Sequence, residues 1–319
     1  METNPSSQQP YKLDFHGKGS DFFSIIIVNW LLTVITLGFY YPWAKAKQLR
    51  YLYSATSFHN DRFQFSGTGK EMFIGYIKTI LIMIILATLY GLTAVLINPI
   101  AGIVVLYLLL FMLIPLMIHG SFRYRMSRTS WRGIRFGYRG NKWDFFGMYL
   151  KWIFLTLITL GFYAAWMDIN YRRYVIGNIK AGDASFQYKG NGLDYFLLNL
   201  KGYLLSVITL GIYSFWWQKD LFAYLYDNLS VRREETELRF KSAATGGGFF
   251  KLSIVNILIL IFTLGLGYAW VVVRTMKFTT DNILTEGDLD ADKLNQTQEN
   301  YTNALGDEMT DFFDIDLTF

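Results

Sequence analysis

Six long apolar segments alternate with shorter polar stretches along the chain. Each is roughly 19–23 residues long and nearly uncharged, and about 20 apolar residues are enough to cross the hydrocarbon core of a bilayer. The segments are residues 22–41, 76–97, 101–119, 145–166, 195–217 and 252–273. The pattern therefore predicts a helical protein in which six segments meet the membrane.

Short aromatic pieces precede most of these segments and alternate apolar with polar residues. Period-two alternation that ends at a glycine, as at Gly67, Gly140 and Gly190, is typical of a strand that leads into a turn. The pieces are residues 13–17, 63–67, 136–140, 186–190 and, more loosely, 238–240. Because lysine and arginine flank these junctions, we expect the pieces to gather as a small sheet on the cytoplasmic side of the membrane.

One motif recurs where an apolar segment ends. The sequence TLGFYYPW of residues 36–43 returns as TLGFYAAW at 159–166, as TLGIYSFW at 209–216 and, less cleanly, as TLGLGYAW at 263–270. A second, amphipathic helix is expected after each copy. Self-similarity at a spacing of about 50 residues indicates a chain assembled from one duplicated supersecondary unit.

These patterns predict an α-helical polytopic membrane protein built of five degenerate helix-corner-helix repeats, with short β-strand pieces between repeats. The expected units are about 11–62, 63–135, 136–185, 186–237 and 238–284. Residues 1–284 would form this repeat-built membrane domain. Residues 285–319 would form an acidic C-terminal tail.

Composition and charge agree with a membrane location. Hydrophobic residues make up 52% of the chain and charged residues only 17%, and the mean hydropathy is +0.24. From Asp281 onward the chain holds eleven acids and one base, which leaves 14 acids and 29 bases, a net charge of +15, before it. We expect basic cytoplasmic loops, close to anionic membrane lipids, and no signal peptide at the start of the chain. Nucleic acid is not an expected partner, because the bases lie beside apolar segments and no nucleic-acid-binding motif accompanies them.

Polar side chains interrupt the apolar segments at related positions. An intramembrane polar group is expensive and is a candidate site by default, although a lysine can also extend back to the interface. The candidate intramembrane polar site comprises Asn29, Lys78, Lys151, Lys201 and Asn256, which we expect to point into the bundle. The basic residues expected at the headgroup level are Arg50, Arg123 and Arg173.

Motifs for catalysis, metals or cofactors are missing from the sequence. Residues 67–70 read GTGK, but they lack the spacing of a phosphate-binding loop. His16, His59 and His119 are scattered, and the chain has no cysteine, so no metal-ligand spacing arises. We therefore predict no catalytic residues, no metal, no cofactor and no enzyme activity.

A family resemblance rests on three of these features. The aromatic strand pieces, the T-L-G-x-Y-x-x-W corner and an Arg-Tyr pair seven residues after the corner tryptophan, as Arg50-Tyr51 follow Trp43, resemble the YjgN-like family. These are bacterial multi-pass inner-membrane proteins of unknown function. The resemblance covers nearly all of residues 11–285 and implies an inner-membrane location, without an established activity or substrate.

Two function classes remain open at this stage. Repeats, intramembrane polar residues and glycine corners favour a transporter or channel for a small or anionic solute or a lipid. Abundant tyrosine and tryptophan, basic loops and a separate acidic tail favour the alternative, a non-catalytic membrane scaffold or lipid-organising protein. A solvent-accessible cavity that reaches Lys151 and Lys201 would favour transport, and the oligomeric state cannot be inferred from the sequence.

The end of the tail differs in pattern from the rest of it. Apolar and polar residues alternate from Phe313 to Phe319, which predicts an edge strand, whereas residues 285–307 have the composition of a solvated linker. The strand could dock on the sheet of its own chain or on a partner. A free tail is the alternative.

Overall fold

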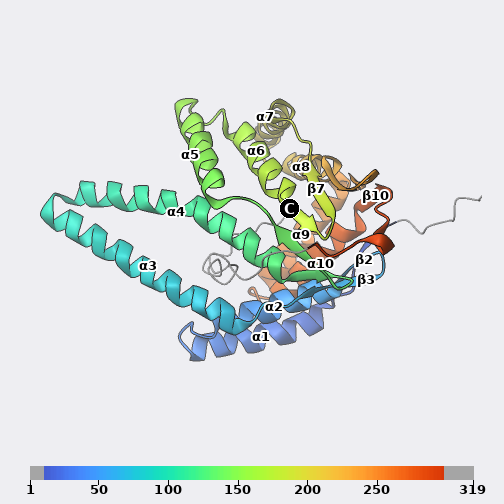
Figure 1. Ribbon diagram of the computed structural model, residues 1–319, viewed down its shortest axis with the longest axis horizontal. Coiled ribbons are helices and arrows are strands. Elements are labelled where there is room, and N and C mark those ends of the chain that lie inside the picture. The colour runs from blue at the N-terminus through green and yellow to red at the C-terminus, as the bar shows by residue number, and fades with distance from the viewer. Residues whose placement is uncertain (1–10, 298–319) are drawn as a thin grey trace, which may run out of the picture.

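The computed structural model describes residues 11–297, in which helical hairpins alternate with strands (Figure 1). Four of the five hairpins have a first helix of 17 residues and a second of 14 or 15, whereas α3 and α4 have 28 and 30 residues. The helices are α1 (Gly19–Ile35), α2 (Tyr41–Ala55), α3 (Gly69–Leu96), α4 (Pro99–Arg128), α5 (Lys142–Ile158), α6 (Ala164–Gly177), α7 (Gly192–Ile208), α8 (Ser214–Asp227), α9 (Gly246–Phe262) and α10 (Tyr268–Asp281), followed by the short 3₁₀ helix η1 (Ala291–Lys293).

The strands form one antiparallel sheet in which the order follows the sequence from β1 to β10. Each β-hairpin therefore links one helical hairpin to the next. The strands are β1 (Leu13–Phe15), β2 (Thr56–Phe58), β3 (Asp61–Phe65), β4 (Thr129–Trp131), β5 (Ile134–Tyr138), β6 (Ile179–Ala181), β7 (Ala184–Tyr188), β8 (Leu229–Arg233), β9 (Thr236–Ser242) and β10 (Ile283–Gly287).

The sheet curls into a nearly closed, barrel-like shape. Its two ends meet where the side chain of Thr285, in β10, donates a hydrogen bond to the carbonyl oxygen of Tyr11, just before β1. Most residues that face inward are apolar and buried or half-buried, and many of those that alternate with them, such as Arg62, Arg232 and Arg239, are exposed. Polar residues outside and apolar residues inside indicate that the outer face of the sheet meets water.

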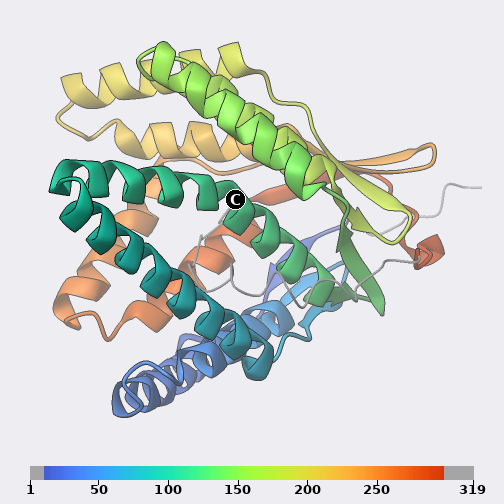
Figure 2. The ribbon, with the colours of Figure 1, turned by 60° about the vertical axis from the view of Figure 1, so that its left-hand side comes forward.

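The helical hairpins extend from one end of the barrel, and their turns all face away from the strands (Figure 2). Neighbouring hairpins contact one another through α2 and α3, α4 and α5, α6 and α7, and α8 and α9. The last helix, α10, packs against the first, α1, so the hairpins close into a ring. The ring and the barrel are therefore two stacked layers with the same order of elements.

The predicted fold class is wrong in its main feature. The structure is not a helical polytopic bundle with strand pieces between repeats, because a ten-stranded sheet organises it. Within residues 11–297, only α3 and α4 are long and apolar enough to cross a membrane, in place of six segments. The physical reason is the corner motif, which ends the first helix of four hairpins after 17 residues, or about 25 Å, short of the roughly 30 Å hydrocarbon core.

Candidate functional site

Four hairpin turns share one backbone geometry, which the Thr-Leu-Gly corner builds. In the first, Thr36 caps α1, and Leu37 and Gly38 follow with positive φ angles of 50° and 93°. The amide of Gly38 donates to the carbonyl oxygen of Thr33 (2.7 Å), and the amide of Leu37 donates to that of Val34 (3.1 Å). These two bonds are those of a Schellman C-cap, which satisfies carbonyl groups at the end of the helix.

The corner threonine also starts the second helix. The hydroxyl of Thr36 donates to the carbonyl oxygen of Leu32 (2.7 Å) and accepts from the amide of Tyr40 (2.9 Å). One side chain thus serves the end of α1 and the start of α2, which explains why the motif needs a hydroxyl there. The same acceptor bond recurs from Tyr163 to Thr159, from Tyr213 to Thr209 and from Gly267 to Thr263.

A leucine occupies the left-handed position in each of these corners and is almost fully exposed. The exposed fractions are 88% for Leu37, 89% for Leu160, 94% for Leu210 and 92% for Leu264, and all four have φ of 50° or 51°. This conformation costs a residue with a side chain roughly 1–2 kcal/mol, so glycine usually fills it. A leucine that is strained and touches almost no protein gains nothing from the fold, but hydrocarbon around the tip would stabilise it.

The long hairpin α3–α4 ends in an apolar turn of a different kind. The side chain of Asn98 accepts a hydrogen bond from the amide of Ala101 (2.8 Å) and so caps α4. Leu96 and Ile97 beside it are 78% and 68% exposed. We call the five turns the tip surface, defined by Leu37, Leu96, Leu160, Leu210 and Leu264. Exposed apolar groups gathered on one side of a protein mark a surface for protein partners or a membrane.

The five residues of the predicted polar site lie in five different hairpins. Asn29 is buried and donates to the carbonyl oxygen of Ala44 across its hairpin (3.3 Å). Asn256 joins α9 to α10, because its amide nitrogen lies 3.2 Å from the hydroxyl of Thr275 and its oxygen accepts from Arg274 (3.2 Å). Each asparagine therefore links the two helices of its own hairpin, and the expected orientation into the bundle stays a prediction.

The lysines of that set lie differently. Lys78 is half-buried, whereas Lys151 and Lys201 are exposed. No contact described within residues 11–297 joins two members of the set. The structure consequently does not assemble them into one place, and a role for them in binding stays a prediction.

Two of the arginines predicted at the headgroup level make the same contact. Arg50 donates to the carbonyl oxygen of Gly67 (3.2 Å), and Arg173 donates to that of Gly190 (2.8 Å). Both glycines lie between a strand and the next hairpin, so these exposed arginines are at the junction of the sheet and the helices. Arg123 is half-buried in the last part of α4.

An apolar cavity of about 380 Å³ lies inside the barrel, and the sequence analysis did not predict it. All ten strands contribute to its wall, which includes Phe58, Trp131, Phe186 and Leu238. The second helices of four hairpins supply more of the lining through their last turns. We call this space the barrel cavity. Neither Lys151 nor Lys201 lines it.

The segment after β10 closes the end of the barrel that lies away from the helices. We call residues 288–297 the strap. Its Leu289 and Leu294 line the barrel cavity, and Leu289 and Ala291 are buried. The strap differs from the solvated linker that its composition predicted, because these few apolar side chains pack into the open end of the barrel.

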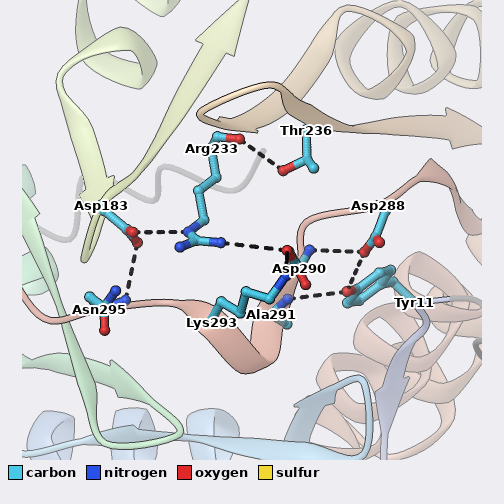
Figure 3. A network of polar contacts seen from close by, with 9 residues as sticks. All are labelled: Tyr11, Asp183, Arg233, Thr236, Asp288, Asp290, Ala291, Lys293 and Asn295. Carbon is cyan, nitrogen blue, oxygen red and sulfur yellow. Dashed lines mark hydrogen bonds and ion pairs between the residues drawn. The ribbon is translucent and has the colours of Figure 1, made fainter.

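Polar contacts hold the strap to the rim of the barrel (Figure 3). Arg233, only 7% exposed, lies 2.9 Å from the carboxylate of Asp183 and 3.9 Å from that of Asp290. Asp183 also accepts from the backbone amide of Asn295 (3.2 Å). The ion pair thus links strand β8, the β6–β7 turn and the strap.

The other end of the strap is tied to the start of the chain. The hydroxyl of Tyr11 donates to Asp288 (2.7 Å) and accepts from the amide of Ala291 (3.2 Å). Hydrogen bonds from the backbone of Asp290 and from Tyr11 lower the pKa of Asp288. Burial and the bond to Asp288 raise the pKa of Tyr11. Both shifts favour an ionised Asp288 carboxylate and a protonated Tyr11 phenol, the states in which Tyr11 donates this hydrogen bond to Asp288.

Comparison with known proteins places the chain among bacterial membrane proteins. A family model described as a bacterial protein of unknown function (DUF898) matches residues 10–189, 183–237 and 233–312. An inner membrane protein YjgN of Salmonella typhimurium is 37% identical over 131 residues, and that of Escherichia coli K12 is 38% identical over 124 residues. These matches cover 40% and 39% of this chain and 31% and 30% of the relatives, so the matched part spans about a third of their length. No solved structure matches the chain.

These matches confirm the family resemblance inferred from the corner motif. They also support a location in the bacterial inner membrane. The predicted strand from Phe313 to Phe319 lies outside the described residues, so it stays a prediction.

Proposed function

Because the chain belongs to the DUF898 family of bacterial proteins of unknown function, whose relatives include inner membrane proteins, we propose that it is a non-catalytic, lipid-organising protein of that membrane. The observation that carries the proposal is the repeated leucine of the tip surface. Four leucines in a strained conformation are exposed on the side of the molecule opposite to the polar sheet. Transfer of these side chains from water to hydrocarbon would offset the cost of that strain.

The hairpins would enter the bilayer to different depths. Helices α3 and α4 are about 42 and 45 Å long, enough to cross the hydrocarbon core and return. The first helices of the other four hairpins reach only about 25 Å. A ring in which four short hairpins stand beside one long hairpin would thin the bilayer locally, because lipid adjusts to an apolar segment that is too short.

The sheet would lie in water on the cytoplasmic side. Its outer face carries arginine and lysine, and Arg50 and Arg173 lie where the strands join the hairpins. Bases at that level are attracted to anionic headgroups by about 1 kcal/mol each. The positive-inside rule favours the same orientation.

Transport is less well supported than this organising role. A transporter of a polar solute needs polar groups along a path through the membrane. The barrel cavity is apolar, and Lys151 and Lys201 do not line it. The two lysines are instead exposed, where their long side chains can extend to the interface.

Spin labels can test the depth of the tips. The chain has no cysteine, so Leu160→Cys and Leu210→Cys give unique nitroxide sites. In vesicles of phosphatidylethanolamine and phosphatidylglycerol, we expect both labels to be accessible to oxygen and protected from a water-soluble nickel complex. Glu234→Cys is the matched control, since Glu234 is also exposed with φ of 48° but lies in the β8–β9 turn. Nickel access at the tips equal to that at Glu234 would refute insertion.

Deuterium order parameters of the lipid chains test the organising role itself. We expect reconstituted protein to lower the order of nearby chains, as a thinner bilayer requires. A variant in which Leu37, Leu160, Leu210 and Leu264 are all changed to Asp should lose most of this effect while α3 and α4 still anchor it. Equal order with both proteins would refute the proposal even if the tips insert.

A further inference from the structure

The barrel cavity is a separate candidate site, distinct from the tip surface. We propose that it binds one long hydrocarbon chain of a lipid, and that the strap closes it toward water. This inference goes beyond the lipid-organising role, because it concerns a bound molecule inside the sheet and not the bilayer around the hairpins.

The lining of the barrel cavity selects the chemical class of its ligand. Its wall is apolar apart from the hydroxyls of three threonines and of Tyr226 and the indole nitrogen of Trp131, and no charged side chain lines it. The hydroxyl of Thr56 already donates to the carbonyl oxygen of Leu52 (2.9 Å), and that of Thr280 donates to Met276 (3.2 Å). A sugar, nucleotide or peptide would lose its hydrogen bonds to water there and gain few in return. A hydrocarbon chain loses none.

The size and flexibility of the barrel cavity suit a chain better than a rigid ligand. Its volume of about 380 Å³ lies within the range of small-molecule sites. Met126 and Met276 line it, and methionine side chains adapt to ligands of varying shape. Closed sheets of about eight strands hold one small ligand, and this sheet has ten strands.

One end of the barrel cavity lies toward the membrane side of the molecule. The last turns of α4, α6, α8 and α10 line it there through Met126, Ile176, Leu225 and Met276. A chain can therefore come from a membrane lipid whose headgroup stays outside, or from a free fatty acid. Both sources have the same hydrocarbon chemistry.

The strap is the closure of the other end. Its apolar side chains face the barrel cavity, and its polar groups bind the rim through Asp183, Arg233 and Tyr11. Gly182 lets the strap backbone approach the β6–β7 turn closely, because a Cβ at this position would collide with the carbonyl oxygen of Asn295. Asp183 accepts from the strap backbone and pairs with Arg233, so its loss should loosen the closure without changing the lining.

Photocrosslinking tests the site with two probes, a diazirine-bearing palmitic acid and a phosphatidylethanolamine that carries the same chain. Purified full-length protein is irradiated with each probe, and the labelled peptides are mapped. We expect crosslinks in β6 to β9, around Ala181, Val231 and Leu238. Labelling by only one probe identifies the source of the chain. Crosslinks confined to the hairpins with both probes would overturn the site.

A filled barrel cavity should exclude the probe. Ala181→Phe places a ring in the space, and we expect it to lower barrel crosslinking about tenfold, an effect that takes only about 1.4 kcal/mol. Its folding is checked by thermal unfolding, and Ala181→Leu is the milder variant. Undiminished barrel labelling in a folded Ala181→Leu or Ala181→Phe protein would overturn the proposal.

Exchange of bound probe tests the closure. Asp183→Ala should speed the release of bound palmitic acid by about tenfold, since it removes contacts of an ion pair. Glu237→Ala is the matched control, because Glu237 pairs with Lys189 and Arg239 on the outer face of the sheet. Equal release rates in the two variants would refute the role of the strap. Insertion of the tips is measured separately, so either proposal can fail alone.

Discussion

The indole ring of Trp270, at the start of the last helix, lies over Gly19, at the start of the first, so closely that a Cβ on Gly19 would collide with it. This contact closes the ring of hairpins, because α10 and α1 are the two ends of the helical order. The same pairing joins neighbouring hairpins elsewhere. The other pairs are Trp43 with Gly69, Trp166 with Gly192 and Trp216 with Gly246.

We predict that alanine at these glycines weakens the packing between neighbouring hairpins. Gly246→Ala forces the new methyl group against Trp216, and overpacking of this kind costs about 1–3 kcal/mol of unfolding free energy. Gly247→Ala is the matched control, because a Cβ there meets no atom within 4 Å. Denaturant unfolding in detergent micelles measures both. Equal losses in the two variants would show that the tryptophan contact does not set the packing.

The sequence pattern predicted half of the strands. All five aromatic pieces, four of which end at a glycine, are strands in the structure, since alternation with period two is a local signal. The partner strands β2, β4 and β6 have only three residues and begin at most one residue after a helix ends, so they offer no such pattern. Their turns carried a signal that was missed, because His59-Asn60 and Arg132-Gly133 suit the positive φ angles of tight hairpins.

The candidate site was predictable only in part. Apolar segments of about 20 residues look alike whether they cross a membrane or turn back at a corner, and the Thr-Leu-Gly motif was the sign that they turn. The barrel cavity could not be predicted, because it needs the closure of the sheet between Tyr11 and Thr285, residues far apart in the chain. The strap was read as solvated because Leu289 and Leu294 are few among many polar residues.

The strain at the tips leads to a second prediction. In the left-handed conformation of Leu210, glycine is favoured over alanine, so Leu210→Gly should be more stable than Leu210→Ala by about 1 kcal/mol. At Leu204, which is half-exposed within α7, the order should reverse by about the same amount. Unfolding of the four variants in micelles measures both differences. The same order at both positions would mean that the corner is not strained.

The polar residues inside the hairpins give a third prediction. Asn256→Leu removes the acceptor of Arg274 and should cost about 1–3 kcal/mol of unfolding free energy, because a charged donor is left unpaired. Lys201→Leu changes an exposed side chain of α7 and should stay within about 0.5 kcal/mol of the unchanged protein. Denaturant unfolding in the same micelles measures the unfolding free energy of both variants. A larger loss at Lys201 would show that this lysine has a role in the fold.

Acid should release the strap. The folded-state pKa of Asp288 is lowered, so its contribution to strap binding is present above the ordinary aspartate pKa of about 4 and is lost as the pH falls through the folded value. The groups that face it are Tyr11, Asp290 and, at longer range, Lys293. A nitroxide at Asn295→Cys should be immobile at neutral pH and mobile in acid.

The variant Asp288→Asn separates this residue from the other carboxylates of the rim. Asparagine keeps an oxygen acceptor for Tyr11 but cannot be protonated in this range, so the label should be looser at neutral pH and respond less to acid. The ion pair of Asp183 with Arg233 is unchanged in that variant, so this part of the strap contact should remain. If the label in Asp288→Asn follows the same pH curve as in the parent protein, another carboxylate controls the strap and Asp288 does not.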